Sequence, residues 1–211
     1  MSMFSDEPLG YEVLSRWPTD DHLPMEFIPI IKSLGLSRRF SEKVLKSAVS
    51  ISKKYENKQI WVNLSPEDLS GEIDWIFESM ENSSNVSLEV TEDSVLTRKQ
   101  LNNLLRLKNN GIMLYLDDFA INHPHDAFLN FFHGIKIDKS ILWAARTSNA
   151  SRSFLRGISV FMREKGLSVI VEGVETIEDC SIVMEAEIPT VQGFFFGTPK
   201  IVDNSDQAGI E

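Results

Sequence analysis

The sequence has little cysteine and no long apolar run. The single cysteine, Cys180, excludes an internal disulfide framework and fits a reducing compartment. Its helical, acidic surroundings favour a structural thiol over a reactive one, because nearby carboxylates raise a thiol pKa. No stretch approaches the roughly 18 apolar residues of a membrane span, and the N-terminus lacks the pattern of a secretory leader. We therefore expect a soluble, cytoplasmic chain that makes no membrane contact.

Basic residues are also scarce. The chain carries 21 Lys and Arg against 31 Asp and Glu, a formal net charge of −10, and it contains no Lys/Arg run. Binding of a nucleic-acid duplex requires a concentrated basic surface, so a duplex is excluded as the partner. An anionic substrate remains compatible with this charge if metal ions bridge the like charges.

The remaining composition is that of a globular domain, with 42% hydrophobic and 25% charged residues. Apolar runs typical of strands alternate with segments of helical periodicity, which predicts parallel β/α units with right-handed crossovers. An α/β barrel and an open doubly wound sheet both fit this alternation. The expected strands cover 11–16, 59–64, 85–92, 111–119, 134–138, 167–175 and 190–197, and the expected helices cover 24–31, 37–55, 67–80, 101–109, 154–165 and 177–187, with a short aromatic helix after 126.

Polar residues follow the predicted strands at the points where these end. The apolar run from Gly111 ends in Asp117 and Asp118, and a buried strand cannot hold two ionised carboxylates unless a cation or solvent meets them. In a barrel all strand exits lie on one face, so residues distant in sequence would meet there. The converging set is Glu12, Asn63, Glu89, Asp117, Asp118, Lys136, Glu172, Glu175 and Gln192.

The chemistry of this set favours hard metal ions. Carboxylate and amide oxygens, without cysteine or a spaced histidine pair, suit Mg²⁺, Mn²⁺ or Ca²⁺ better than zinc. A two-metal site of this kind activates water and neutralises a phosphate, as phosphoester hydrolysis requires. Lys136 would stay protonated among the acids and orient the water or a phosphate oxygen. Taken singly, any one carboxylate could equally be an exposed strand end.

The ordered motifs resemble those of EAL domains, bacterial phosphodiesterases that open cyclic di-GMP to linear pGpG. The resemblance runs from about residue 10 to residue 199 and keeps the order of the motifs. The matching segments are Glu12-Val13-Leu14 with Arg16, Asn63-Leu64-Ser65-Pro66, Leu88-Glu89-Val90-Thr91-Glu92, Asp117-Asp118-Phe119, Lys136-Ile137-Asp138, Glu172-Gly173-Val174-Glu175-Thr176 and Gln192-Gly193-Phe194-Phe195.

The resemblance implies a modified TIM-type (β/α) barrel with two divalent cations, Mg²⁺ or Mn²⁺, and cyclic di-GMP as substrate. It also implies a homodimer. Under it, Glu12, Asn63, Glu89, Asp117, Asp118 and Glu172 would hold the metals. Lys136, Glu12, Glu172 and Glu175 would be catalytic, with Lys136 positioning the water. Leu14, Arg16 and Gln192 would contact substrate, and Glu92 would hold the loop after Asp118.

Two segments depart from the family pattern. Only 11 residues precede Glu12, where the family has a further helix and strand, so we expect a shortened N-terminal strand region. Residues 1–9 would form an extension or truncated first strand, 10–200 the barrel and 201–211 a flexible tail. The loop of residues 120–126 replaces a glycine-rich segment and contains a proline, which removes conformational freedom. This favours an alternative function, a catalytically impaired module that binds cyclic di-GMP or a regulatory protein.

Two other groups of side chains have competing interpretations. His123 and His125 could add metal ligands, but loop histidines beside a proline favour a solvated position. The cluster of Phe128, Phe131 and Phe132 could be core or dimer interface. Residues 194–196, all phenylalanine, are expected in the last barrel strand.

Overall fold

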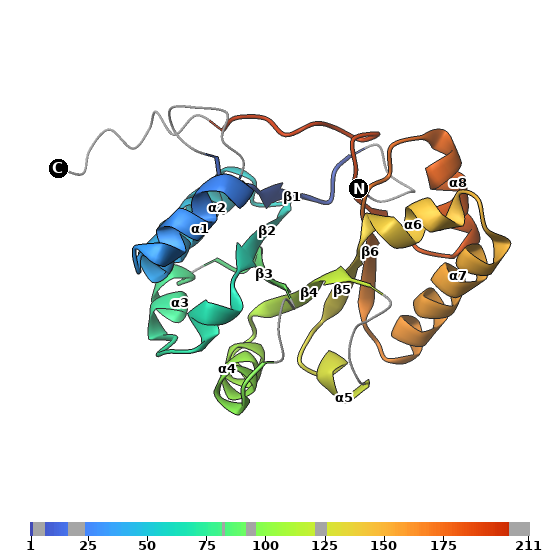
Figure 1. Cartoon of the computed structure of the whole chain (residues 1–211). Helices are drawn as coiled ribbons and strands as arrows, with labels where there is room; N and C mark the ends of the chain where they lie inside the picture. The colour runs from blue at the N-terminus through green and yellow to red at the C-terminus, as the bar shows by residue number, and fades with distance from the viewer. Residues whose placement is uncertain (2–6, 17–23, 82, 92–95, 121–125, 203–211) are drawn as a thin grey trace.

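A single curled sheet of seven parallel strands forms the centre of the molecule (Figure 1). The computed structural model describes residues 1, 7–16, 24–81, 83–91, 96–120 and 126–202. Each strand pairs with the next one in sequence, so the expected β/α barrel architecture is confirmed. The strands are β1 (Gly10–Val13), β2 (Gln59–Leu64), β3 (Val86–Thr91), β4 (Met113–Phe119), β5 (Gly134–Ile137), β6 (Ser168–Val171) and β7 (Thr190–Val191).

Helices cover the outer side of this sheet (Figure 1). They are α1 (Pro24–Ser33), α2 (Ser37–Lys54), the 3₁₀ turn η1 (Pro66–Leu69), α3 (Asp74–Ser79), α4 (Arg98–Asn109), α5 (Asp126–Leu129), α6 (Lys139–Ala145), α7 (Asn149–Glu164) and α8 (Ile177–Glu185). Capping boxes begin α4 at Thr97 and α8 at Thr176, where the threonine and the residue three positions on satisfy each other's backbone N–H groups. None of the described helices is both long and apolar enough to span a bilayer.

The alternation of side chains along each strand separates the core from the site. In β2 and β3, Val62, Leu64, Leu88 and Val90 are buried in one hydrophobic core together with helix residues such as Leu104. Because successive strand residues point to opposite faces, Asn63 and Glu89 lie on the other face. The barrel interior therefore receives the polar residues, and the helices cover the apolar ones.

A packed aromatic layer lies inside the sheet below the polar residues. Trp61 of β2 and Tyr115 of β4 meet edge to face, with ring centroids 6.0 Å apart. A Cβ atom on Gly134 would lie 2.6 Å from the Tyr115 ring, and one on Gly10 would lie 2.5 Å from the Trp61 ring. Glycine at these two positions leaves room for the rings, which therefore pack in the interior beneath the polar site.

Met1 lies beside the outer edge of β7. Its terminal ammonium donates to the Val191 carbonyl at 2.6 Å, and the Val191 N–H donates to the Met1 carbonyl at 3.0 Å. Two residues that exchange both hydrogen bonds form an antiparallel pair. Met1 therefore pairs with β7, while the division of the chain at residues 9 and 200 stays a prediction.

The structure corrects three sequence predictions. The last strand ends at Val191, and Gly193–Phe196 form a turn in which Phe194 and Phe195 are 66% and 46% exposed. A side chain on Gly193 would collide with the Val174 carbonyl, so the chain turns there against the preceding loop. The predicted helix over 67–80 is two short helices, η1 and α3, and α6 was not predicted at all.

Two predictions about buried residues are confirmed. Phe132 is fully buried and Phe128 and Phe131 pack against the same core. Cys180 is a buried free thiol, and burial together with the neighbouring Asp179 raises its pKa. Neither observation tests the predicted dimer interface.

Candidate active site

Lys136 lies at the centre of a ring of carboxylates. Its Nζ atom is 2.7 Å from Glu172 Oε1, 3.1 Å from Glu89 Oε1, 3.3 Å from Glu12 Oε2 and 3.5 Å from Asp117 Oδ1. These acids come from β1, β3, β4 and the exit of β6, and the lysine side chain is 1% exposed. The predicted convergence of strand exits therefore occurs at the carboxyl end of the sheet.

Two amides fix Glu12 within this ring. Asn63 Nδ2 donates to Glu12 Oε1 at 3.1 Å, and Gln192 Nε2 donates to Glu12 Oε2 at 2.6 Å. Glu12 thus connects β1 to β2 and to the end of β7, so this carboxylate spans the two edges of the sheet.

The exit of β2 is held by a buried aspartate. Asp68 Oδ2 accepts hydrogen bonds from the Ser65 backbone N–H at 3.1 Å, the Ser65 hydroxyl at 2.9 Å and the Ser41 hydroxyl of α2 at 2.8 Å. This capping box follows the last strand residue, Leu64, and fixes the backbone next to Asn63.

A backbone irregularity separates the two aspartates of β4. The pairing register of β4 with β5 shifts between Leu116 and Phe119, and Asp118 has a φ of 53°. Such a bulge re-aims side chains at the end of a strand. Asp117 is buried against Lys136 while Asp118 is exposed, yet oxygens of Asp117, Asp118 and Glu172 all lie within 4.8 Å of one another.

The electrostatic balance of the ring is strongly acidic. Burial raises the pKa of Glu89 well above its usual range, and Glu12 and Asp117 add to the rise while Lys136 opposes it. Burial likewise raises the pKa of Asp117 and brings that of Glu172 to about 7. For Lys136, burial alone would lower the pKa, but Glu89, Glu12, Asp117 and Glu172 outweigh it and hold the pKa well above its usual value.

The donor set fits divalent cations. An ammonium has three N–H bonds and cannot satisfy every carboxylate around it. Among the described residues, no hydrogen-bond donor reaches Glu89 Oε2 or satisfies Asp117 Oδ1, although both atoms are buried. Unpaired buried carboxylate oxygens are costly unless a cation meets them, and an all-oxygen set is typical of Mg²⁺, Mn²⁺ or Ca²⁺. The residues that could hold such ions are Glu12, Asn63, Glu89, Asp117, Asp118 and Glu172.

Comparison with known proteins identifies the family. The family model described as the EAL domain matches residues 1–199. This chain belongs to the EAL domain family.

Curated relatives of this EAL domain are longer proteins. It is 30% identical over 211 residues to an uncharacterized signaling protein of Caulobacter vibrioides, covering 93% of this chain and 26% of that protein. It is 27% identical to the probable cyclic di-GMP phosphodiesterase PdeA of Escherichia coli, covering 90% of this chain and 28% of that protein. The chain thus spans about a quarter of the length of these relatives.

A solved structure agrees in fold. The manganese and cyclic di-GMP complex of Klebsiella pneumoniae BlrP1 is 25% identical and superposes with a TM-score of 0.76, covering 89% of this chain and 50% of that one. A complex of the same protein holds calcium with cyclic di-GMP. The modified TIM-type barrel is therefore the fold of this EAL domain, and divalent metals accompany the nucleotide in BlrP1.

Some predicted site residues of the EAL domain lie apart from the ring around Lys136. Glu175 pairs with Arg146 at 3.2 Å. Leu14 is exposed at the exit of β1, and the Arg16 guanidinium donates to the Ser15 carbonyl at 2.8 Å. Their roles stay predictions. Glu92, His123 and His125 lie outside the described residues, as does most of the loop of residues 120–126.

Sequence reasoning missed a group of residues that contact the turn carrying Glu172. Trp143 and Arg146 of the α6 region contact the turn after β6, and Asp179 of α8 joins them. The pattern Thr176-x-x-Asp179 is a capping-box signal that could have located the start of α8. Nothing in the sequence indicates that Arg146 pairs with it across 33 residues.

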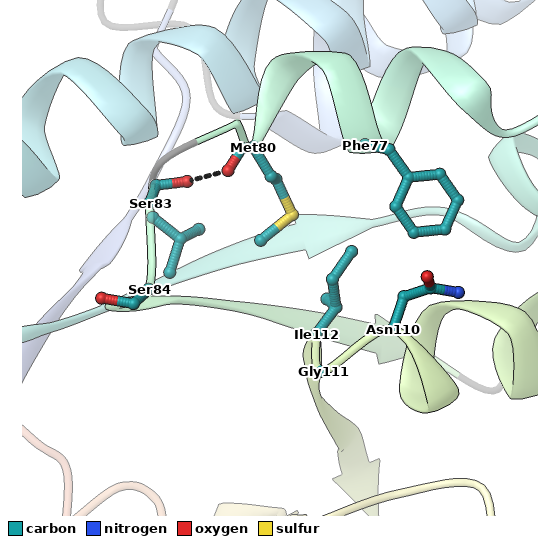
Figure 2. Close-up of a pocket in the computed structure, with 8 residues that line it drawn as sticks. Phe77, Met80, Ser83, Ser84, Asn110, Gly111 and Ile112 are labelled. Carbon is teal, nitrogen blue, oxygen red and sulfur yellow. Dashed lines mark hydrogen bonds between the residues drawn. The ribbon is translucent and has the colours of Figure 1, made fainter.

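A separate hollow lies at the opposite end of the strands. It is lined by Phe77, Met80, Ser83, Ser84, Val86, Asn110, Gly111 and Ile112. Val86 begins β3 and Ile112 precedes β4, so this hollow is at the amino ends of the strands. Figure 2 shows its apolar side chains and the Ser83 hydroxyl donating to the Met80 carbonyl. None of the lining residues that the structure describes is titratable, and the hollow is distinct from the carboxylate ring.

Proposed function

We propose that this EAL domain hydrolyses cyclic di-GMP to linear pGpG in a reaction that depends on two divalent cations, Mg²⁺ or Mn²⁺. The observation that carries the proposal is Lys136, buried at the carboxyl end of the sheet among carboxylates from four strand exits. Its support comes from the family, from relatives such as PdeA, and from the nucleotide in the BlrP1 complex.

The chain's own residues have separable tasks in this reaction. Bound divalent cations would neutralise phosphate charge and lower the pKa of the attacking water. The Lys136 ammonium, fixed at 2.7 Å from Glu172, donates to the water or to a phosphate oxygen. The Glu172 carboxylate, held beside the Lys136 ammonium, would accept the proton of that water. The water oxygen forms a new bond to one phosphorus as the P–O bond from that phosphorus to a ribose oxygen breaks, and the departing ribose oxygen takes up a proton.

Residues at the mouth of the site would select the nucleotide. Arg16, at the exit of β1, supplies a positive charge for the second phosphate, and Leu14 offers an apolar contact. Gln192 orients Glu12 and lies next to the exposed Phe194. We retain Glu175 as a catalytic candidate and Glu92 as the residue that holds the loop after Asp118. A homodimer in the cytoplasm is the expected setting.

A second function is supported by the loop of residues 120–126, whose sequence has Ala120, Ile121 and Asn122 where the family has glycines, and adds Pro124. A stiff loop would allow the domain to bind cyclic di-GMP or a regulatory protein without turning the nucleotide over.

The test measures binding and turnover on the same sample. The purified chain is titrated with cyclic di-GMP in Ca²⁺ by calorimetry, and is then incubated with the nucleotide and Mn²⁺ while pGpG is followed by chromatography. Binding followed by product supports the enzyme. Binding without product supports the nucleotide-binding form of the second function. The absence of both binding and product contradicts the enzyme and that form, and leaves binding of a regulatory protein as the function.

A further inference from the structure

The turn after β6 carries Glu172 and is hydrogen-bonded on one side to the segment that follows β7. The Val174 N–H donates to the Gln192 carbonyl at 3.1 Å, and the Phe195 N–H donates to the Val174 carbonyl at 3.1 Å. Gly173 adopts a φ of 71°, a left-handed conformation that favours glycine, directly after Glu172. The backbone that holds the Glu172 carboxylate is therefore a short, sharply bent segment.

The other side of this turn rests on α6. Trp143 Nε1 donates to the Gly173 carbonyl at 3.2 Å. A Cβ atom on Gly173 would lie 2.4 Å from the Lys139 Cβ, so α6 approaches the turn closely. The Trp143 ring is flanked by two cations, with Lys139 Nζ and the Arg146 guanidinium carbon each 5.2 Å from the ring centroid.

Arg146 and Asp179 lock the turn to both helices. Arg146 Nε and Nη2 donate to Asp179 Oδ1 and Oδ2, each at 2.8 Å, a bidentate pair. Asp179 Oδ2 also accepts from the backbone N–H groups of Glu175 at 2.9 Å and Thr176 at 3.1 Å. Burial alone would raise the pKa of Asp179, but Arg146 and these N–H groups hold it below its usual value, so the carboxylate stays charged.

The contacts of Trp143, Arg146 and Asp179 connect the segment after Lys136 to the turn that carries Glu172. α6 begins three residues after Lys136, where the Asp138 side chain caps it by accepting from the Ser140 N–H. α6 and α8 are in contact on the outer side of β6 (Figure 1). The distance between the two charged groups is therefore set by two routes, the β5–β6 pairing and the contacts of α6 with the turn.

We propose that Arg146 and Trp143 are positioning residues that hold the turn of residues 172–176 against α6 and thereby fix the Glu172 carboxylate for divalent-cation binding and turnover. This inference rests on the proposed function. Among the described residues, neither side chain forms a hydrogen bond or ion pair with Lys136 or with a proposed metal ligand, although Arg146 also pairs with Glu175 at 3.2 Å. Removing partners that orient a metal ligand typically costs about 10–100-fold in metal affinity or activity.

The test compares Arg146→Ala, Arg146→Lys and Trp143→Phe with the matched control Arg156→Ala. Arg156 forms a similar arginine–carboxylate pair with α8 neighbour Glu187, at 2.7 Å, but does not contact the turn. Mn²⁺ affinity is measured by electron paramagnetic resonance, without nucleotide. We expect Arg146→Ala to weaken it about tenfold or more. Trp143→Phe, which loses one neutral hydrogen bond, should weaken it on the order of fivefold, and Arg156→Ala should leave it unchanged.

Two further readouts separate positioning from general damage. In metal-free protein, deuterium uptake by peptides covering 172–179 should accelerate in Arg146→Ala and not in Arg156→Ala. With cyclic di-GMP, kcat should fall while KM stays within about twofold, because the group acts on a reacting residue and not on the nucleotide. Should Arg146→Ala fail to fold, Arg146→Lys carries the test, since lysine keeps the charge but not the bidentate pair.

The outcomes are distinguishable from those of the proposed function. If the wild-type chain binds Mn²⁺ but does not hydrolyse the nucleotide, the proposed function fails, and Mn²⁺ affinity and deuterium uptake still decide the role of Arg146. Wild-type Mn²⁺ affinity and wild-type deuterium uptake in Arg146→Ala would overturn the inference, even in an active enzyme. A loss no larger than that of Arg156→Ala would also overturn it.

Discussion

A single buried cation organises the site. Lys136 faces four carboxylates, so the ring holds more negative charge than the lysine can balance. Protons or divalent cations must supply the rest, and which of them does so depends on pH and on metal concentration. Stability and metal binding of this domain are therefore linked through individual titratable groups.

Replacing the lysine tests this balance. In Lys136→Met without metal at pH 8, the carboxylates lose their only buried cation among the described residues, and the free energy of unfolding should fall by about 3 kcal/mol. The loss should shrink at pH 5, because protonated acids no longer repel. Urea unfolding at both pH values measures it. Lys99→Met, which removes an exposed pair with Glu72, should change stability by less than about 0.5 kcal/mol.

The raised pKa of Glu172 predicts a pH dependence with a definite sign. Its pKa of about 7 in the folded protein exceeds the usual 4.5, so the folded state binds the proton more tightly than the unfolded state. The stability from this group is complete below about pH 4.5 and is lost as the pH rises through 7. In metal-free protein, Glu172→Gln should flatten this part of the stability profile. An identical slope in wild type and variant would contradict the assignment.

At the scale of elements, the turn after β6 depends on glycine. Gly173→Ala adds the cost of a left-handed backbone, about 1–2 kcal/mol, and an overlap with the Lys139 Cβ. Gly111 has a φ of 82° and open space around it, so Gly111→Ala isolates the backbone cost. We expect Gly173→Ala to lower both melting temperature and Mn²⁺ affinity, and Gly111→Ala to lower only the melting temperature. Equal Mn²⁺ affinities in the two variants would argue against the turn's role.

Secondary-structure elements also differ in how far the sequence predicts them. Strand exits such as Glu12, Asn63 and Glu89 were predictable, because alternation and parallel topology bring them to one face. The short helix α6 was not, since seven residues give too few turns for a periodic pattern. The left-handed φ of Asp118 and the pairing of Arg146 with Asp179 depend on contacts that form only in the folded chain.

The proposed metal site would connect most strands of the sheet. Its proposed ligands come from β1, β2, β3, β4 and the exit of β6, so bound cations would connect elements from residue 12 to residue 172. A ligand that binds only the folded state stabilises it by about 2.7 kcal/mol at a concentration of 100 times Kd. For a domain of this size that shift corresponds to a melting temperature roughly 5–10 °C higher.

Calorimetric melting with and without Mn²⁺ measures this coupling. Asp117→Asn should abolish the rise, because it removes the charge of a proposed metal ligand whose Oδ1 atom is satisfied by no hydrogen bond within the described residues. A metal-dependent rise that persists in Asp117→Asn would place the ion elsewhere in the molecule.

The most direct test of the proposed function is the fate of solvent oxygen during turnover. The wild-type chain is incubated with cyclic di-GMP and Mn²⁺ in ¹⁸O-labelled water, and the products are resolved by mass spectrometry. We predict linear pGpG carrying one ¹⁸O atom on its terminal phosphate, formed by wild type and Arg156→Ala and not by Lys136→Met. Unchanged cyclic di-GMP at saturating Mn²⁺, in protein shown to bind the nucleotide, would contradict hydrolysis at the Lys136 site.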